Sequence, residues 1–314
     1  MVRFLTLRLS LMVATLLVVS LAIFTITEIL PGDVATMMFR QNATEQNLKR
    51  VREDLGLDRP AHVRYLSWMG GVVRGDWGDS YFQKRPIVDI ASSRLGNSVI
   101  LAVFAFLVAV PTAVATGLWA GIRPDTLGGR KGSVASRVRI SMPEFVTGVL
   151  FIVLFSSWLG LFPSTSIVPP GTNPLTRPQI LVLPTLTLMG VLFAYVMRMT
   201  RANVIEVMQT HYVRTAILKG LSMRRVIFRH VVPNAMLPTI TIIAQNFGWM
   251  LGGLIIVETV FAYPGLGLLL LSSIQTRDVP LLQALALLIA ATYAISNLVA
   301  DLSYAALDPR IRLA

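Results

Sequence analysis

The sequence predicts an all-α membrane protein with six transmembrane helices. Of its 314 residues, 54% are hydrophobic and only 14% are charged, a balance too apolar for a soluble domain. A helix needs roughly 20 consecutive apolar residues to cross a bilayer. Such runs lie near residues 9–30, 97–121, 140–162, 179–200, 237–261 and 281–304. An even number of spans predicts that both ends of the chain lie on one side of the membrane.

The basic residues predict which side of the membrane each connection faces. The net charge of +12 is not gathered into one basic domain, as nucleic-acid binding would require, but lies at the ends of the apolar runs. The short connections on one side carry only Arg177 and Arg277, whereas basic residues crowd the other side. Because cytoplasmic loops carry the excess of Lys and Arg, both termini and the connection 201–236 are predicted to be cytoplasmic.

The first run, within residues 1–30, stays apolar up to Leu30 and is interpreted as an uncleaved span, not as a signal peptide. Residues 31–95 form the only long outer connection and are predicted to fold as a small extracytoplasmic cap. Within it, residues 45–57 have the composition of a helix. A later segment spaces apolar side chains three and four residues apart, with aromatic rings suited to headgroup depth, which favours anchoring at the bilayer surface. These side chains are Tyr65, Trp68, Met69, Val72 and Val73.

Residues 96–314 hold the other five spans. Gly117 and Gly121 form a small-xxx-small pattern at the end of the second span, which favours close packing against a helix of the same chain. The apolar stretch Leu268 to Ile274 is too short to span, so we expect it to lie at the outer surface or to dip back into the membrane.

Four acidic residues lie in or near the apolar runs, where a charge is costly and usually faces a cavity or a partner. Glu28 and Glu258 fall near the outer ends of their runs, and Glu144 and Asp301 near the inner ends. None lies midway, where a proton-coupled carrier usually needs a carboxylate. Pairing with interfacial arginines or capping of helices is the simpler interpretation of these acids, and Glu258 is the one that we assign to an outer gate.

The functional interpretation depends on the stretch from His211 to Pro238, which begins in the connection 201–236 and ends at the start of the fifth apolar run. Thr210 is placed to cap a helix that begins there. Gly220 is expected to stop or bend that helix, because a residue without Cβ adopts positive φ at little cost. Pro233 is expected to end a second helix, since it lacks a backbone donor.

The second helix of this stretch is predicted to be amphipathic. Met223, Ile227 and Val231 recur every fourth residue on one face, and arginines lie on the opposite side. The first helix is short and apolar although its connection should face water. The pattern therefore indicates a knob that inserts into a groove on another protein.

This stretch resembles the signature loop of the membrane-spanning subunits of ABC importers, specifically the dipeptide/oligopeptide/nickel permeases. Tyr212-Val213-Arg214-Thr215-Ala216 followed by Lys219-Gly220-Leu221 is similar to the peptide branch, and Pro233 follows Gly220 by thirteen residues. The segments LPGD, LGLDRP and GDWGDSY look like the subunit of the peptide-importer pair with the long outer loop. The segments ETVF, PGLG and RD-P and the ending NLVADLSYAALDPRIR are also similar, so the resemblance covers nearly the whole chain.

The resemblance implies the type I ABC importer permease fold in a bacterial inner or plasma membrane. It further implies that the chain is half of a translocation pathway for di- or oligopeptides delivered by an extracytoplasmic substrate-binding protein, which the cap helps to receive. The expected partners are a second, homologous permease subunit and two cytoplasmic ATPases that bind ATP and Mg. This chain is then expected to bind no cofactor and to catalyse no reaction.

The resemblance also implies two groups of functional residues. The loop 211–233 would dock into an ATPase through Tyr212, Val213, Ile217 and Leu218, with Arg214, Thr215 and Ala216 beside them, Gly220 as the turn and Pro233 as the terminator. An outer gate or pathway group would comprise Glu258, Phe261, Pro264, Gly265 and Gly267.

The motifs weigh against other functions. His62, His211 and His230 form neither HExxH nor another metal pair, no GxSxG occurs, and the glycine-rich connection after the second span lacks the GxxxxGK[ST] spacing. The alternative that remains is a proton-coupled secondary carrier or a channel that acts without ATPase subunits. Similar permeases serve dipeptides, longer peptides, glutathione-like compounds, opines and nickel chelates, with selection mainly by the receptor.

Overall fold

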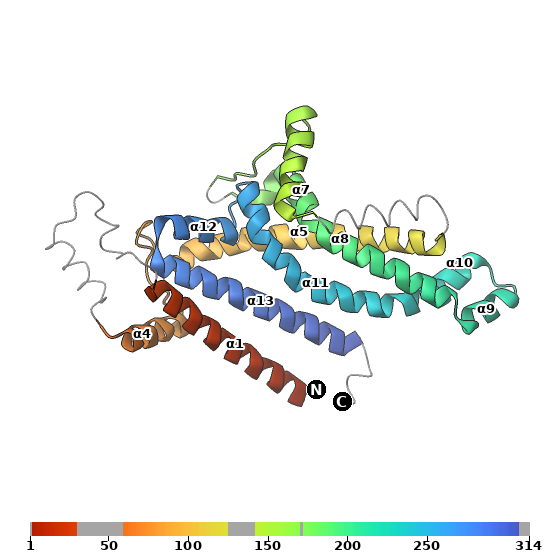
Figure 1. The fold of residues 1–314 in the computed structure, drawn as a ribbon, viewed down its shortest axis with the longest axis horizontal. Helices are drawn as coiled ribbons and strands as arrows, with labels where there is room; N and C mark the ends of the chain where they lie inside the picture. The colour runs from red at the N-terminus through yellow and green to blue at the C-terminus, as the bar shows by residue number, and fades with distance from the viewer. Residues whose placement is uncertain (1, 30–58, 125–141, 170–171, 308–314) are drawn as a thin grey trace. The chain divides into compact units, whose positions relative to one another are not determined.

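The computed structural model describes residues 2–29, 59–124, 142–169 and 172–307, and in these ranges the chain is all-α (Figure 1). Its only extended pairing there is an isolated bridge between Asp79 and Pro86. The predicted helix over 45–57 lies outside the described residues. The described part of the chain divides into two compact units, which are considered separately below. Unit 1 comprises residues 1–97 and 264–295, and unit 2 comprises residues 98–263 and 296–314.

Unit 1 is built from helices of both ends of the chain. They are α1 (Val2–Ile29), α4 (Ala61–Arg74), the first turns of α5 (Ile87–Ile122), α12 (Leu266–Thr276) and the first part of α13 (Val279–Leu307). Their apolar core is formed by Ile87, Ile90, Ala91, Leu266, Leu269, Leu281, Ala284 and Leu285. The predicted half-helix 268–274 is therefore confirmed as α12, which begins and ends two residues beyond the expected bounds.

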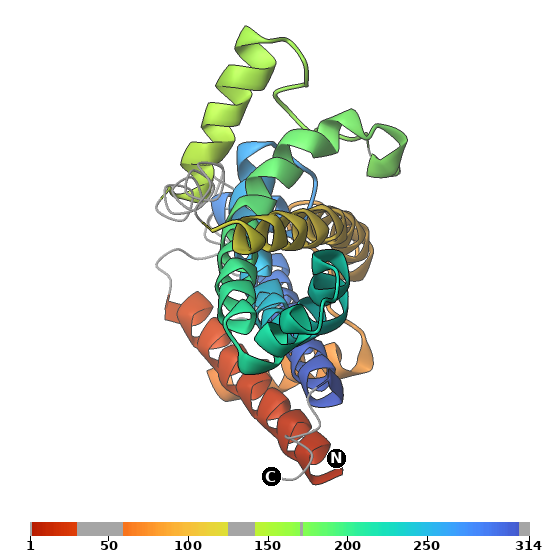
Figure 2. The ribbon, with the colours of Figure 1, turned by 90° about the vertical axis from the view of Figure 1, so that its right-hand side faces the viewer.

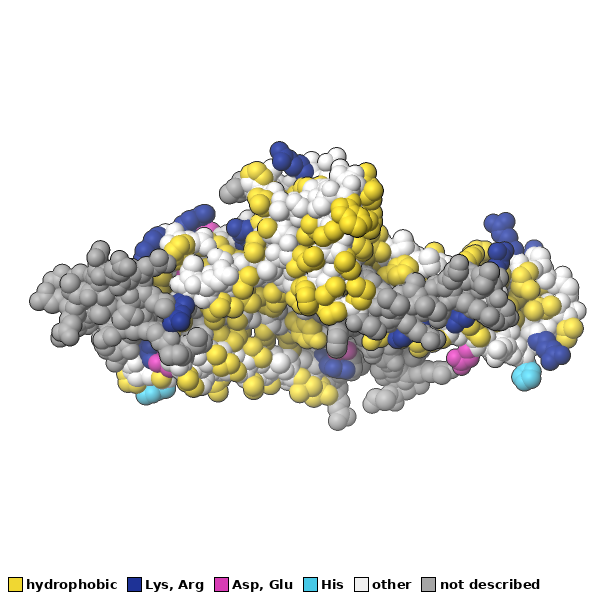
Figure 3. Space-filling model, turned by 45° about the horizontal axis from the view of Figure 1, so that its top comes forward, with side chains coloured by type: hydrophobic (Ala, Val, Ile, Leu, Met, Phe, Trp, Pro, Cys, Tyr) yellow, Lys and Arg dark blue, Asp and Glu magenta, His cyan; other side chains and the backbone are white. Residues whose placement is uncertain are grey.

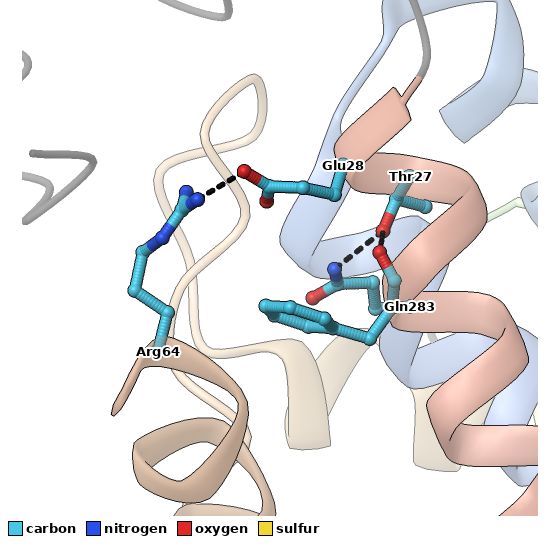
Figure 4. A network of polar contacts seen from close by, with 5 residues as sticks. Thr27, Glu28, Arg64 and Gln283 are labelled. Carbon is cyan, nitrogen blue, oxygen red and sulfur yellow. Dashed lines mark hydrogen bonds and ion pairs between the residues drawn. The ribbon is translucent and has the colours of Figure 1, made fainter. Parts of the chain in front are cut away.

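Polar contacts join α1 to its neighbours in unit 1. The Gln283 side-chain amide of α13 donates a hydrogen bond to the Thr27 hydroxyl of α1 at 2.7 Å, and both side chains are buried (Figure 4). One residue further along α1, Glu28 forms an ion pair with Arg64 of α4. This ion pair confirms the expectation that Glu28 meets an arginine.

The main feature of unit 2, among the described residues, is the extensive contact between α8 (Gln179–Met208) and α11 (Val232–Val260). The elements of this unit are the remainder of α5, α7 (Glu144–Phe151) with its π-helical continuation η2 (Ile152–Trp158), the short η3 (Pro174–Thr176), α8, α9 (His211–Leu218), α10 (Met223–Val226), the π-helical η4 (Ile227–Val231), α11 and the last part of α13. Helices α8 and α11 pack along each other, and α9 and α10 lie at the end of α8 nearest the viewer in Figure 2. Figure 3 shows hydrophobic side chains over the exposed face of the α7–η2 segment.

Small residues let α5 approach α8 closely. A β-carbon built on Gly117 would lie 2.7 Å from the Met197 carbonyl oxygen, and one on Gly121 would lie 2.7 Å from the Val204 side chain. Interior packing at close range leaves no room for such atoms. The prediction that these two glycines serve packing within the chain is confirmed.

The helices match the six predicted apolar runs, but fewer of them are long enough to span. Four described segments are long and apolar enough, namely Leu5–Ile29, Ile87–Ile122, Met223–Ala244 and Val279–Leu302, and the bent pair Gln179–Gly190 and Leu192–Met208 makes a fifth if it is one span. The third predicted span, 140–162, is a helix only from Glu144 to Trp158. The helix is shorter than predicted because the chain leaves helical geometry at Gly160, whose φ is +60°.

Candidate functional site

The stretch His211–Val231, called the basic turn below, begins with the eight-residue helix α9. Thr210 occupies the N-cap position with an extended backbone, as predicted. However, its hydroxyl donates to the Val207 carbonyl at 2.6 Å instead of accepting a bond from α9. The position of the cap is therefore confirmed, whereas its expected side-chain hydrogen bond to α9 is absent from this structure.

Gly220 closes α9 in a left-handed conformation, with φ +76°. Its N–H donates to the Ile217 carbonyl at 2.9 Å, and the N–H of Leu221 donates to the Ala216 carbonyl at 3.3 Å. This pair of bonds is the Schellman arrangement, which satisfies the last carbonyls of a helix and favours glycine. A β-carbon on Gly220 would meet no atom within 4 Å, so the backbone conformation alone selects for glycine here.

The two faces of α9 have different surroundings. Val213 is fully buried and Ala216 nearly so, and both belong to one apolar cluster with Val204, Val226, Val231 and Ala235. Tyr212 and Ile217 are exposed by about two fifths, and Leu218 is 80% exposed. Val213 is therefore not part of the inserting surface predicted from the sequence. It faces inward because the helical spacing from 213 to 216 puts both residues on the side that meets α8 and α10.

The second half of the basic turn differs from the prediction at Pro233. The chain passes from α10 through η4 into α11 without a break, and Pro233 lies in the first turn of α11. The Val232 N–H reaches back five residues to the Ile227 carbonyl, which is the π-helical pattern. Pro233 therefore does not end a helix: it lies within this continuous helical stretch, directly after the π-helical turn, where the regular i→i−4 bonding that would use the donor proline lacks is already interrupted. Val226 rather than Met223 faces the core, and Met223 is about half exposed.

The buried side of the basic turn is joined to the ends of α8 and α11. Val204 of α8 and Ala235 of α11 belong to the same apolar cluster as Val213. The Asn203 side chain adds polar links from α8 to α11, since its amide donates to the Thr239 hydroxyl at 3.2 Å and to the Ala235 carbonyl at 3.4 Å. The exposed side is basic, with Arg214, Lys219, Arg224, Arg225 and Arg229 all at the surface. The arrangement presents a cationic surface with apolar side chains that is firmly packed onto two membrane helices.

The predicted outer gate residues Glu258 and Phe261 lie in unit 2 and are fully buried. The Ser98 hydroxyl of α5 donates to the Glu258 carboxylate at 2.5 Å. The Phe261 carbonyl accepts a hydrogen bond from the Ser166 N–H at 2.7 Å. A buried carboxylate is stable only when hydrogen bonds or charges compensate its lost hydration, so Glu258 fixes the end of α11 against α5.

The remaining residues of that group, Pro264, Gly265 and Gly267, lie in unit 1 and are buried at the start of α12. The Asn97 side-chain amide donates to the Pro264 carbonyl at 2.9 Å. Gly265 precedes α12 with an extended backbone. The five predicted residues are therefore divided between the two units at the Tyr263–Pro264 bond, and their assignment to a gate stays a prediction.

Sequence reasoning missed Asp278, which is 1% exposed and accepts four hydrogen bonds in unit 1. Its carboxylate accepts from the Ser80 hydroxyl at 2.5 Å, from the Phe82 and Tyr81 N–H groups at 3.1 and 3.2 Å, and from the Leu281 N–H at 3.4 Å. The last of these caps α13. Burial, with a smaller contribution from the Asp278 charge, raises the pKa of the Tyr81 phenol above its ordinary value. The available signal was an aspartate just before Val279 and Pro280, a common way for a helix to begin.

The other acidic residues make different contacts. Glu144 of α7 lies against Gly253 of α11, where a built β-carbon would come within 2.7 Å of the carboxylate. Asp301 is partly buried on α13. Within the described ranges, no group of three or more His, Asp or Glu side chains is arranged to hold a metal ion.

Comparison with known proteins places these features in context. Residues 90–313 match the family described as "Binding-protein-dependent transport system inner membrane component", and residues 1–102 match "Binding-prot-dependent transport system membrane comp, N-term". The chain is 36% identical over 310 residues to the "Probable peptide ABC transporter permease protein y4tP" of Sinorhizobium fredii, covering 97% of each chain. It is also 36% identical over 312 residues, 99% of each chain, to the "Glutathione transport system permease protein GsiC" of Escherichia coli (strain K12) and of Salmonella typhimurium.

Proposed function

The chain belongs to the family of binding-protein-dependent transport system inner membrane components, and from that premise we propose that it forms half of a peptide pathway driven by separate ATPases. It is a multi-pass transmembrane permease subunit of an ABC importer, and the type I importer fold accounts for its helices. The further elements of the proposal are the coupling surface, the substrate class and the partners.

The observation that carries the proposal is the two-sided construction of the basic turn. Leu218, Ile217 and Tyr212 project from a helix whose other side is packed onto α8 and α11. A side chain that is exposed at one end of a well-packed unit is suited to receive a partner, and the packing behind it transmits a displacement to the membrane helices. Neighbouring Arg214, Lys219 and Arg224 favour an acidic rim on that partner.

In the proposed mechanism this chain performs no chemistry. ATP and Mg bind to two partner ATPases, whose closure pushes the basic turn. The displacement passes through Val213 and Ala216 to α8 and α11 and changes which side of the pathway is open. The driving force is the difference between the affinities of the ATP-bound partner for the two conformations of the permease.

Peptides are the proposed substrate class. The relatives described above are named for peptide and for glutathione transport, and glutathione is itself a short peptide. A substrate-binding protein would deliver the peptide on the outer side, and a second, homologous permease chain would complete the pathway. The distribution of basic residues supports a cell membrane orientation with both termini in the cytoplasm.

A reconstitution experiment tests this function against the carrier or channel alternative. Proteoliposomes would contain the chain with the permease, ATPase and substrate-binding proteins with which it co-purifies. Uptake of a labelled dipeptide and of glutathione is measured with ATP, without ATP, and without the ATPases. Uptake that needs both ATP and the ATPases is expected, whereas uptake by the chain alone down a proton gradient would overturn the proposal.

A further inference from the structure

Helix α4 carries apolar side chains on two sides, and one side is occupied by α1. Tyr65 and Trp68 pack on Phe24 with ring centroids 5.4 and 6.3 Å apart, and the Tyr65 hydroxyl lies 2.9 Å from the Ser20 hydroxyl. The ion pair between Arg64 and Glu28 continues this contact toward the end of α1 (Figure 4). The aromatic residues that the sequence assigned to the headgroup region therefore also hold α4 against α1.

The opposite side of α4 is an exposed apolar stripe formed by Val63, Leu66 and Val73. Leu66 is 66% exposed and Val73 is 81% exposed. Their spacing of three and seven residues keeps the three side chains on one side of the helix. We call these three residues the outer stripe.

The charged side chains on helix α4 itself are all basic. Helix α4 contains no acidic residue, and Arg59, His62 and Arg74 are exposed at its two ends. Interfacial helices combine an apolar face with basic residues in the same way, because the phosphates of lipid headgroups attract cations. A surface that binds a soluble protein usually combines apolar and polar side chains. The outer stripe consists of aliphatic side chains alone, which favours lipid as its partner.

The depth of α4 follows from its attachment to α1. The apolar span Leu5–Ile29 is hardly covered within the chain, and its exposed Leu21, Ile26 and Ile29 face lipid when it crosses a bilayer. Its 25 residues make a helix about 37 Å long, which exceeds a hydrocarbon core of roughly 30 Å. The excess of about 7 Å is less than two turns, so the last turn, where Glu28 holds Arg64, passes through the boundary between hydrocarbon and headgroups, and the contacts at Phe24 and Ser20 lie progressively deeper.

We propose that α4 is an interfacial helix that embeds the outer stripe in the leaflet around the Ile29 end of α1. The occupant of the stripe is phospholipid, with acyl chains against Val63, Leu66 and Val73 and headgroup phosphates near Arg59 and Arg74. The stripe is thereby continuous with the lipid-facing surface of α1. This role is independent of the coupling proposed for the basic turn.

The absence of cysteine from the chain permits a direct test by site-directed spin labelling. Leu66→Cys reports on the outer stripe and Ser67→Cys is the matched control, because Ser67 is the exposed next residue on the same helix. Val18→Cys, at a 69% exposed site in the middle of α1, is the lipid reference. Each full-length labelled protein is placed in nanodiscs of phosphatidylcholine and phosphatidylglycerol, and collision rates with oxygen and with a water-soluble nickel chelate are measured.

Oxygen dissolves in lipid and the nickel chelate in water, so the two rates distinguish three surroundings. For the Leu66 label we expect a ratio of oxygen to nickel collisions several-fold above that of the Ser67 label and near that of the Val18 label. A high nickel rate with a low oxygen rate, far from the Val18 values, would mean that water covers the stripe. Low rates for both reagents would mean that protein covers it, and either result overturns the proposal. Val73→Cys repeats the measurement if the Leu66 variant does not purify as a stable protein.

Discussion

Gly117 of α5 lies so close to Thr200 of α8 that a β-carbon on the glycine would meet the threonine side chain at 2.7 Å. The Met197 carbonyl oxygen is equally near, and neither group can move without shifting α8. We expect Gly117→Ala to lower the free energy of unfolding by about 1–3 kcal/mol, the usual cost of overpacking. Thermal unfolding of the purified protein in detergent measures the effect.

Gly96 supplies the control on the same helix. A β-carbon there meets nothing within 4 Å, so Gly96→Ala should leave the protein as stable or slightly more stable, by up to about 1 kcal/mol. Equal effects of the two substitutions would show that α5 and α8 are not in close contact.

Gly220 is predicted to be needed for its backbone conformation. Gly220→Leu places a side chain in the left-handed region at a cost of about 1–2 kcal/mol and should abolish substrate-stimulated ATPase activity while the protein still inserts in the membrane. Gly220→Asn is the matched control, because asparagine tolerates this region, and it should retain most of the activity. Loss of activity in both variants would show that coupling requires the absence of a side chain at position 220, and that the backbone conformation alone does not explain the need for glycine.

The two faces of α9 should respond differently to substitution. Leu218→Asp is expected to leave the unfolding temperature unchanged and to remove ATPase stimulation, because Leu218 is exposed. Val213→Ala should lower the free energy of unfolding by roughly 1–3 kcal/mol, since it removes buried methyl groups. Thermal unfolding and ATPase activity are measured on both variants. Unimpaired ATPase stimulation in Leu218→Asp would show that the exposed face of α9 is not the coupling surface.

Glu258 provides a test of the predicted gate. Glu258→Gln keeps a carbonyl that accepts the Ser98 hydrogen bond but replaces the ionisable carboxyl group by an amide. We expect reduced peptide uptake with normal assembly, measured in the reconstituted system. Ser98→Ala is the companion variant, because it removes the hydrogen bond and keeps the carboxyl group. Unchanged uptake in Glu258→Gln would show that Glu258 is not a residue of the gate.

Asp278 should hold the segment 79–86 in place. Asp278→Ala removes the acceptor of the Tyr81 and Phe82 N–H groups, and hydrogen bonds to a charged group are worth about 1.5–3 kcal/mol. Hydrogen exchange of these amides should therefore become faster by at least tenfold. The control is Asp79→Asn, at an exposed neighbour in the same segment, which should leave the exchange rates unchanged.

The sequence was sufficient to predict the helices because the apolar runs are long and are separated by polar connections that contain Gly and Pro. It was also sufficient for Gly220, since the need for positive φ is a local property. It could not separate Val213 from Leu218, because which side of an eight-residue helix is buried depends on α8 and α11. The role of Pro233 was misjudged because the π-helical turn that precedes it, and through which the helix continues, has no signature in the sequence pattern.

Asp278 illustrates a different limit. Its partners Ser80, Tyr81 and Phe82 lie almost two hundred residues away in the chain, and no periodicity links them. The end of the 144–158 helix likewise could not be predicted. The helix stops before Gly160, which has a positive φ, but the apolar composition continues past this residue and gives no sign of the end.

The unbroken passage from α10 through η4 into α11 has a mechanical consequence. Helix α11 alone has 29 residues and is about 43 Å long, with the basic turn at its start and Glu258 near its other end. It can act as a lever, so that tilting it by about 5° moves one tip by about 4 Å relative to the other. A push delivered beside Met223 would thus reach Glu258 through the backbone itself, with no relay of side chains in between.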